Sequence, residues 1–230
     1  MRIRVPGQKI TDPVAHANRR GGGPFRLQKE VDRWGAWAPH YTTLTRFGQV
    51  DGVRWYNNCG PTAVTNLLVM ARRRFRDLPP DPQGDRAIYA KVARYGARRL
   101  IYVNLEKGPF RGTSDLRAGT YLRRMFARFA GLRPTVRIRR ASGTSLQASL
   151  DRGALLYLVL RRHPAYRNHH LAGYGYAIVE SEVTGEKRIY WKVSDGHASG
   201  PRYLAPEDCR RSLWVYYEIT FPSREKACEE

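Results

Sequence analysis

Cys59 is the side chain whose position gives it the clearest chemistry, because the sequence after it predicts a helix from about residue 60 to 75. The backbone N–H groups of a first helical turn have no partner within the helix, and the helix dipole favours an anion there. A thiol at that place can ionise below the pKa of a free cysteine and act as a nucleophile. Pro61 suits the first turn, an apolar stripe follows it, and arginines cluster near the end.

Two further reactive groups follow later in the chain. The pair His169-His170 opens an apolar run at residues 170–183, and Asp195 follows a second run at 187–194. Both runs have the pattern of strands. A histidine beside a cysteine can accept the thiol proton, and a carboxylate behind the histidine can fix its tautomer. Cysteine, histidine and aspartate together therefore indicate nucleophilic catalysis on a carbonyl group.

The segment Asn58-Cys59-Gly60-Pro61-Thr62-Ala63 resembles the nucleophile motif of the papain-like cysteine peptidases, and in particular that of their bacterial C39-like branch. The resemblance covers about residues 50–222. It implies an α+β, papain-like fold, in which N-terminal helices carry the nucleophile at a helix N-terminus and an antiparallel β-sheet follows. It also implies a thiol hydrolase that cleaves peptide or isopeptide bonds through a Cys-His-Asp triad and a thioester intermediate, with no cofactor.

In families of this type the histidine is followed by five mostly apolar residues and then by Gly-Tyr. Counting back from Gly175-Tyr176 selects His169 as the base. His170 is the alternative base, because one residue further along a strand it faces the opposite side of the sheet. The family also has a polar residue that ends the next strand and orients the imidazole, and Asp195 matches it. An aspartate before Gly196 also has the pattern of a turn.

Acyl transfer needs hydrogen-bond donors for the oxyanion, and the backbone N–H of Cys59 is the first of them. In the family a glutamine usually lies six residues before the cysteine, whereas this chain has Val53 there. The side-chain amides of Asn57 and Asn58 are the candidate replacements. Gln49, further upstream, is a less favoured one.

Two other functions fit the same residues. A glutamine deamidase or a transglutaminase uses the same triad and differs in what it acts on or in the acceptor. A basic nucleic-acid-binding or interaction protein on an inactive peptidase scaffold fits both Val53 and the net charge of +21. The histidines and cysteines lack the usual spacing of metal ligands, so no metal site is predicted.

Composition bounds the partners and the location. The 34 arginines and 7 lysines are spread along the chain without a known nucleic-acid motif, so we expect a peptide or protein substrate and no specific nucleic acid. The oligomeric state is left open.

The 3 cysteines are too few for a disulfide framework; Cys209 and Cys228 could pair, but we expect free thiols. The sequence has no membrane segment and no signal peptide, which favours a cytoplasmic protein, or a secreted one if a signal was removed.

The remaining pattern divides the chain into three parts. Residues 1–48 have the composition of a partly flexible, basic arm, poorly ordered up to about residue 25 and irregular after it. Residues 49–222 form the catalytic domain and 223–230 a tail. Further helices are predicted at 84–97, at 114–130 between a Ser114 cap and a Gly131 stop, and at 145–151. Further strands are predicted at 154–161 and 213–221, which gives α+β order.

Overall fold

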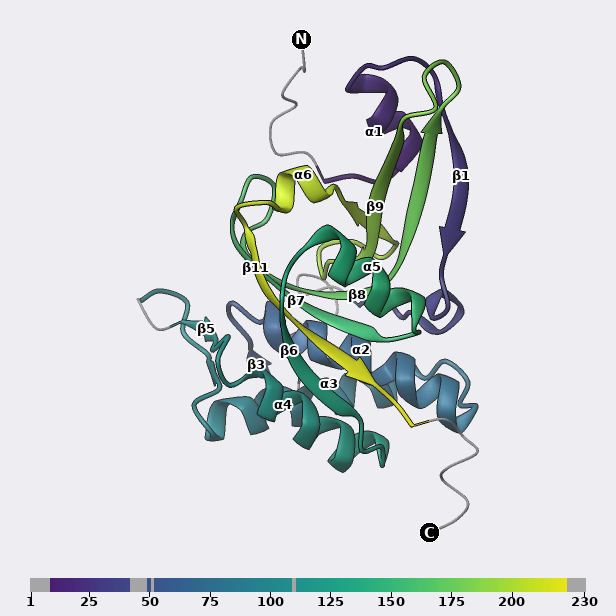
Figure 1. Cartoon of the computed structure of the whole chain (residues 1–230). Helices are drawn as coiled ribbons and strands as arrows, with labels where there is room; N and C mark the ends of the chain where they lie inside the picture. Colours follow the sequence, from purple (N-terminus) through teal and green to yellow (C-terminus); the bar gives the residue numbers. More distant parts are fainter. Residues whose placement is uncertain (1–8, 42–48, 51, 109–110, 223–230) are drawn as a thin grey trace.

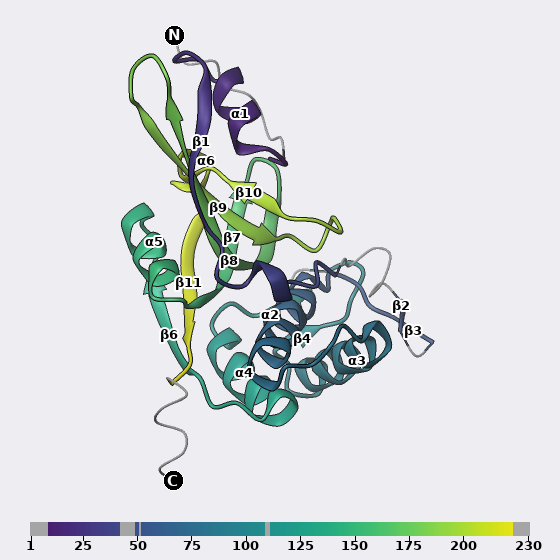
Figure 2. The ribbon, with the colours of Figure 1, turned by 90° about the vertical axis from the view of Figure 1, so that its right-hand side faces the viewer.

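Three helices gather on one side of an antiparallel sheet: α2 (Cys59–Arg76), α3 (Pro82–Arg98) and α4 (Ala118–Met125) (Figures 1 and 2). This computed structural model describes residues 9–41, 49–50, 52–108 and 111–222. The strands of the sheet, in spatial order, are β10 (Arg202–Leu204), β9 (Lys187–Ser194), β8 (Arg167–Ser181), β7 (Leu155–His163), β11 (Leu213–Thr220) and β6 (Thr135–Arg140). The fold is α+β, as the sequence predicts.

The strand β8 is the centre of the sheet, and its 15 residues pair with three neighbours. Its first part pairs with β7, where His170 lies opposite Val159. Its later part pairs with β9 and also with β1 (Phe25–Val31). The register with β9 shifts between Gly173 and Gly175, which marks a bulge that adds one residue to β8. An added residue changes the face of the sheet toward which every residue before it points.

Helix α2 is buried over most of its length because it lies between the sheet and α3. Its residues from Gly60 to Ala71 are all buried. Its apolar side chains share a core cluster with Ala172 and Tyr174 of β8 and with Tyr157 of β7. This packing fixes the N-terminus of α2, and Cys59 with it, relative to the sheet.

The opposite face of the sheet has its own core. Helix α5 (Gly143–Asp151) contributes Leu146 and Leu150, and the short α6 (Pro206–Cys209) contributes Cys209. Leu171 of β8 belongs to this second cluster. Cys209 is a buried free thiol, and Cys228 lies outside the described residues. No helix in the described part of the chain combines the length and apolarity that a membrane crossing requires.

The N-terminal region is more ordered than the sequence predicts. Residues Pro13–Arg19 form α1, which the Asp12 carboxylate caps by accepting the N–H of Val14 at 2.8 Å. Residues Phe25–Val31, expected to be irregular, form β1 along β8 (Figure 1). Gly175 permits this approach, since a Cβ there would lie 2.4 Å from the Val31 carbonyl oxygen. The pairing depends on a distant strand, and local composition carries no sign of it.

The other predicted elements are confirmed within a few residues, with one exception. The helix expected at 114–130 begins at Ala118, and its last turn is the π-helix η2 (Phe126–Ala130), which ends at Gly131 with a φ of 62°. Ser114 is not its cap, because the N-cap position is held by Arg117; the Ser114 N–H donates to the Ile101 carbonyl at 2.7 Å. That bond extends the pairing of β4 (Tyr102–Val103) with β5 (Gly112–Thr113), two short strands without sequence periodicity. The strands β2 (Gln49–Val50) and β3 (Val53–Arg54) form a second small hairpin.

Candidate active site

Cys59 is the first residue of α2, as predicted, and it is half-buried. The helix starts with the Asn58 carbonyl accepting the Thr62 N–H at 3.0 Å. Burial raises the pKa of the Cys59 thiol to about 11, although the backbone N–H groups of His170, Gly60 and Cys59 itself lower it. At neutral pH the thiol of the free protein is therefore protonated. If the thiol loses its proton, these three backbone N–H groups stabilise the thiolate.

Cys59 lines a cavity of about 830 Å³, and both histidines of the predicted pair line it too. The cavity lies between the start of α2, the β5 strand and the turn that joins β7 to β8. Asp195 is not among its lining residues, whereas Asp115 is. The structure thus brings Cys59, His169 and His170 together around one cavity, and the predicted Asp195 does not line it.

The two histidines lie on different faces of β8. His170 alternates with Ala172, which packs in the core cluster of α2, so it is on the face that carries Cys59. His169 alternates with Leu171, which packs in the cluster on the other face. The bulge after Gly173 shifts the alternation of β8 by one residue. In a regular strand His170 and Tyr176 would lie on the same face of the sheet, whereas here they lie on opposite faces. The geometry therefore favours His170, the alternative base, as the partner of Cys59.

The His170 ring is held from both sides. Its Nδ1 accepts a hydrogen bond from the Tyr157 hydroxyl, and its Nε2 lies 3.4 Å from Oδ1 of Asp115. Asp115 is itself clamped by Arg161, whose Nε and Nη2 lie 2.9 and 2.6 Å from its Oδ2. The proton of the neutral ring is therefore on Nε2, facing the carboxylate, and Nδ1 is the basic nitrogen.

The electrostatics keep this ring neutral. Burial lowers the pKa of His170 to about 4, and the Asp115 carboxylate opposes that effect while Arg161 adds to it. Burial raises the pKa of Tyr157 well above its ordinary value, and the neighbouring Cys59 adds to the rise. The resting site is thus a neutral thiol, a neutral phenol and a neutral imidazole in mutual proximity.

His169 and Asp195 meet in the structure, but through the main chain. Nε2 of His169 donates to the Asp195 carbonyl oxygen at 2.6 Å, and its ring stacks on that of His197 with centroids 4.3 Å apart. The Asp195 carboxylate instead accepts the N–H groups of His197 and Ala198 at 2.8 and 3.1 Å, and the Tyr166 hydroxyl at 3.1 Å. The carboxylate of Asp195 therefore stabilises the turn at Gly196, and a turn before Gly196 is the alternative that the sequence also indicates for this aspartate.

The amides predicted to serve the oxyanion are engaged elsewhere. Nδ2 of Asn57 donates to the carbonyl oxygens of Leu105 and Glu106 at 2.7 and 3.3 Å. Nδ2 of Asn58 donates to the Tyr89 hydroxyl at 2.7 Å. Val53 is 37 % exposed on the β2–β3 hairpin, and the side chain of Gln49 lies outside the described part.

Thr113 supplies a donor that sequence reasoning missed. It lines the same cavity, and its Oγ1 is buried without a hydrogen-bond partner in the described structure. A Cβ on Gly60 would lie 2.0 Å from that oxygen, so the hydroxyl sits directly against the first turn of α2. Its position on β5 follows from pairing with β4, and no local motif in the sequence marks it.

The mouth of the cavity is positively charged. Arg111, Arg162 and Arg167 line it and are exposed, while its one carboxylate among the described residues, Asp115, is paired with Arg161. Both Arg162 and Arg167 have positive φ angles, 53° and 56°, at the ends of the β7–β8 turn. The site therefore presents excess positive charge to an incoming substrate.

In the part of the chain that the structure describes, no three His, Cys, Asp or Glu residues are grouped so as to hold a metal ion. No model of a known protein family matches this chain. No curated protein matches it either.

Proposed function

We propose that this protein is a thiol acyl hydrolase of papain-like architecture that cleaves peptide or isopeptide bonds, with Cys59 as nucleophile and His170 as base. The observation that carries the proposal is that one cavity joins the thiol at the start of α2 to an imidazole held between Tyr157 and Asp115. A helix N-terminus stabilises a thiolate, and a carboxylate on Nε2 stabilises an imidazolium. Asp115 takes the orienting role that the sequence assigns to Asp195.

The chemical step begins with transfer of a proton. The Cys59 proton passes to the Tyr157 oxygen while the Tyr157 proton passes to Nδ1 of His170, so the phenol stays neutral throughout. The thiolate then attacks the substrate carbonyl carbon and forms a C–S bond, and the charge moves to the carbonyl oxygen. The C–N bond breaks as the imidazolium returns its proton to the leaving amine. Water, deprotonated by His170, attacks the resulting thioester, releases the acid and restores the thiol.

Two donors are available for the oxyanion: the backbone N–H of Cys59 and the hydroxyl of Thr113. The first belongs to α2 and the second packs from β5 against its first turn, where the helix dipole also favours negative charge. A buried donor without a partner in the resting site gains a hydrogen bond only when the oxyanion forms, which is the condition for catalysis by differential binding.

Activity is tested with a mixed peptide library and mass spectrometry of the products. We expect new peptide termini with the native chain and none with Cys59→Ala. Cys209→Ala is the matched control, because Cys209 is the other described cysteine and lies in the core on the far face of the sheet. Release of ammonia from glutamine peptides without cleavage would move the assignment to a deamidase. Equal product formation by the native chain and Cys59→Ala would refute a thiol mechanism.

The choice of base is tested by exchanging the two histidines separately for glutamine. We expect His170→Gln to lower kcat by about a hundredfold or more, as for loss of a general base, and His169→Gln to leave kcat within a few-fold. Both variants should carry the native fold by circular dichroism. The reverse ranking would return the role to His169.

A further inference from the structure

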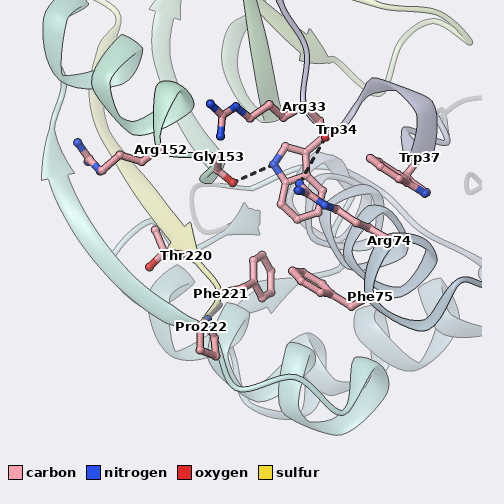
Figure 3. Close-up of a pocket in the computed structure, with 10 residues that line it drawn as sticks. All are labelled: Arg33, Trp34, Trp37, Arg74, Phe75, Arg152, Gly153, Thr220, Phe221 and Pro222. Atoms are coloured by element: carbon pink, nitrogen blue, oxygen red, sulfur yellow. Dashed lines mark hydrogen bonds between the residues drawn. The ribbon is translucent and has the colours of Figure 1, made fainter. Parts of the chain in front are cut away.

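A second cavity, of about 480 Å³, lies near the C-terminal end of α2, away from Cys59 at its start (Figure 3). It shares no lining residue with the first cavity. Aromatic rings and guanidinium groups from four separate segments form its walls: Arg33, Trp34, Trp37, Arg74, Phe75, Arg152 and Phe221. Its volume lies within the range of small-molecule sites, about 300–1,000 Å³.

The aromatic wall is fixed before any ligand arrives. Nε1 of Trp34 donates to the Gly153 carbonyl at 3.0 Å, and the Phe75 and Phe221 rings lie with centroids 4.8 Å apart. Trp34 is fully buried behind these rings, whereas Trp37 is only half-buried. In Figure 3 the Trp37 ring stands apart from the packed group of Trp34, Phe75 and Phe221. The Arg74 guanidinium lies 5.4 Å from the centroid of the Trp37 ring, so Trp37 offers a planar ligand the part of its ring that Arg74 leaves exposed.

Two of the three arginines that line this cavity carry charge that no carboxylate in the described structure balances. Arg74 lies over the Trp34 ring at 4.2 Å and donates from Nη1 to the Arg33 carbonyl at 3.3 Å. Burial lowers the pKa of Arg74, and the positive charge of Arg33 lowers it further. Within the described residues no carboxylate pairs with Arg33 or Arg74, while Arg152 is paired with Glu218. The half-buried Arg74 charge, with the exposed Arg33 charge near it, is unfavourable until an anion joins them.

We propose that this cavity binds a nucleotide, with its phosphate on Arg33 and Arg74 and its base against Trp37. Guanidinium groups match the geometry of phosphate oxygens with paired N–H donors, and aromatic side chains stack on bases of any identity. Charge alone would attract any anion to a chain of net charge +21, so the ring surface beside the arginines is what selects this ligand. A free nucleotide and one nucleotide of a single strand present the same phosphate and base.

The test is isothermal titration calorimetry of the full chain at about 150 mM salt, where long-range attraction is screened. The probes are AMP, adenosine, inorganic phosphate and a short single-stranded poly(A). We expect AMP to bind at one site, with adenosine and phosphate at least about tenfold weaker, since each supplies half of the contacts. If poly(A) binds and Arg33→Gln weakens its binding as it weakens that of AMP, the ligand of this cavity is a single strand. If AMP binds and poly(A) does not, the ligand is a free nucleotide.

Variants separate this site from general attraction. Arg33→Gln and Trp37→Leu should each weaken AMP binding at least about tenfold. Arg98→Gln, at an exposed arginine that ends α3, should leave it unchanged, as should Cys59→Ala, which abolishes only the proposed hydrolase activity. Equal affinity for AMP and inorganic phosphate, or equal losses in Arg33→Gln and Arg98→Gln, would overturn the proposal. Thermal unfolding of each variant confirms that it is folded.

Discussion

The hydroxyl of Thr113 packs directly on Gly60, the residue that follows the candidate nucleophile: a Cβ at Gly60 would lie 2.0 Å from Thr113 Oγ1. That oxygen is buried and has no hydrogen-bond partner within the described residues. An unsatisfied buried hydroxyl costs about 1–3 kcal/mol of stability. The contact also explains the glycine, since any larger residue at 60 would displace the hydroxyl.

Replacing Thr113 with valine, which has the same shape, separates catalysis from stability. We expect Thr113→Val to lower kcat by about a hundredfold, as for loss of an oxyanion donor, with KM little changed. The free energy of unfolding should stay level or rise by about 1 kcal/mol, because a buried unpaired polar group is removed. Steady-state kinetics and urea unfolding measure the two effects.

Thr113→Ser is the matched control, because it keeps the hydroxyl and should retain most of the activity. A valine variant as active as the native chain would mean that Thr113 donates nothing to the reaction.

In the proposed mechanism the thiol proton reaches Nδ1 of His170, the nitrogen to which the Tyr157 hydroxyl is hydrogen-bonded. If the phenol relays that proton, Tyr157→Phe breaks the path and should lower kcat at least about tenfold. Stability should fall by about 1 kcal/mol for the lost hydrogen bond, which thermal unfolding reports. An unchanged or higher kcat would instead show that the proton passes directly and that the phenol only occupies the nitrogen at rest.

Much of the framework follows from the sequence, because it depends on local pattern. The start of α2 at Cys59, the strand Lys187–Ser194 and the stop at Gly131 are all set by nearby residues. What the sequence does not reveal depends on pairing between distant segments. The β1 strand exists because β8 extends far enough to pair with it, and nothing in its own composition requires that.

The residues of the candidate site also differ in whether local sequence or distant pairing determines their position. Cys59 is marked by the helix it begins, but Asp115 and Thr113 come from an irregular region that tertiary pairing brings to the cavity. The choice between His169 and His170 depends on one added residue in β8. Family spacing counted along the chain does not register a bulge, although the bulge reverses which histidine faces α2.

The charged mouth of the first cavity predicts a preference among substrates. A peptide with glutamate beside the cleaved bond should have a higher kcat/KM than its glutamine counterpart, by about fivefold at low salt, because each surface charge pair contributes about 1 kcal/mol. Arg162→Gln should reduce the difference, and so should added salt. Arg98→Gln is the control, at an exposed arginine that does not line the cavity. A difference that persists in the variant would place the selectivity elsewhere.

Buried histidines make stability depend on pH in a direction that can be calculated. Burial lowers the pKa of His169 to about 3 and that of His170 to about 4, against 6.5 for an unperturbed histidine. Below pH 6.5 the unfolded chain therefore binds protons that the folded chain does not. This contribution is fully present above pH 6.5 and is lost as the pH falls toward 4, by about 1.4 kcal/mol per pH unit for each histidine.

The variant His169→Gln isolates one histidine, because the glutamine amide keeps a donor for the Asp195 carbonyl while it cannot titrate. Urea unfolding at pH 7, 6 and 5 should give a stability that falls less steeply in the variant, by about 1.4 kcal/mol per pH unit between pH 6 and 5. This window lies above the range in which most carboxylates titrate, so the difference belongs to the histidine. Parallel slopes for the variant and the native chain would mean that His169 is accessible to protons in the folded state.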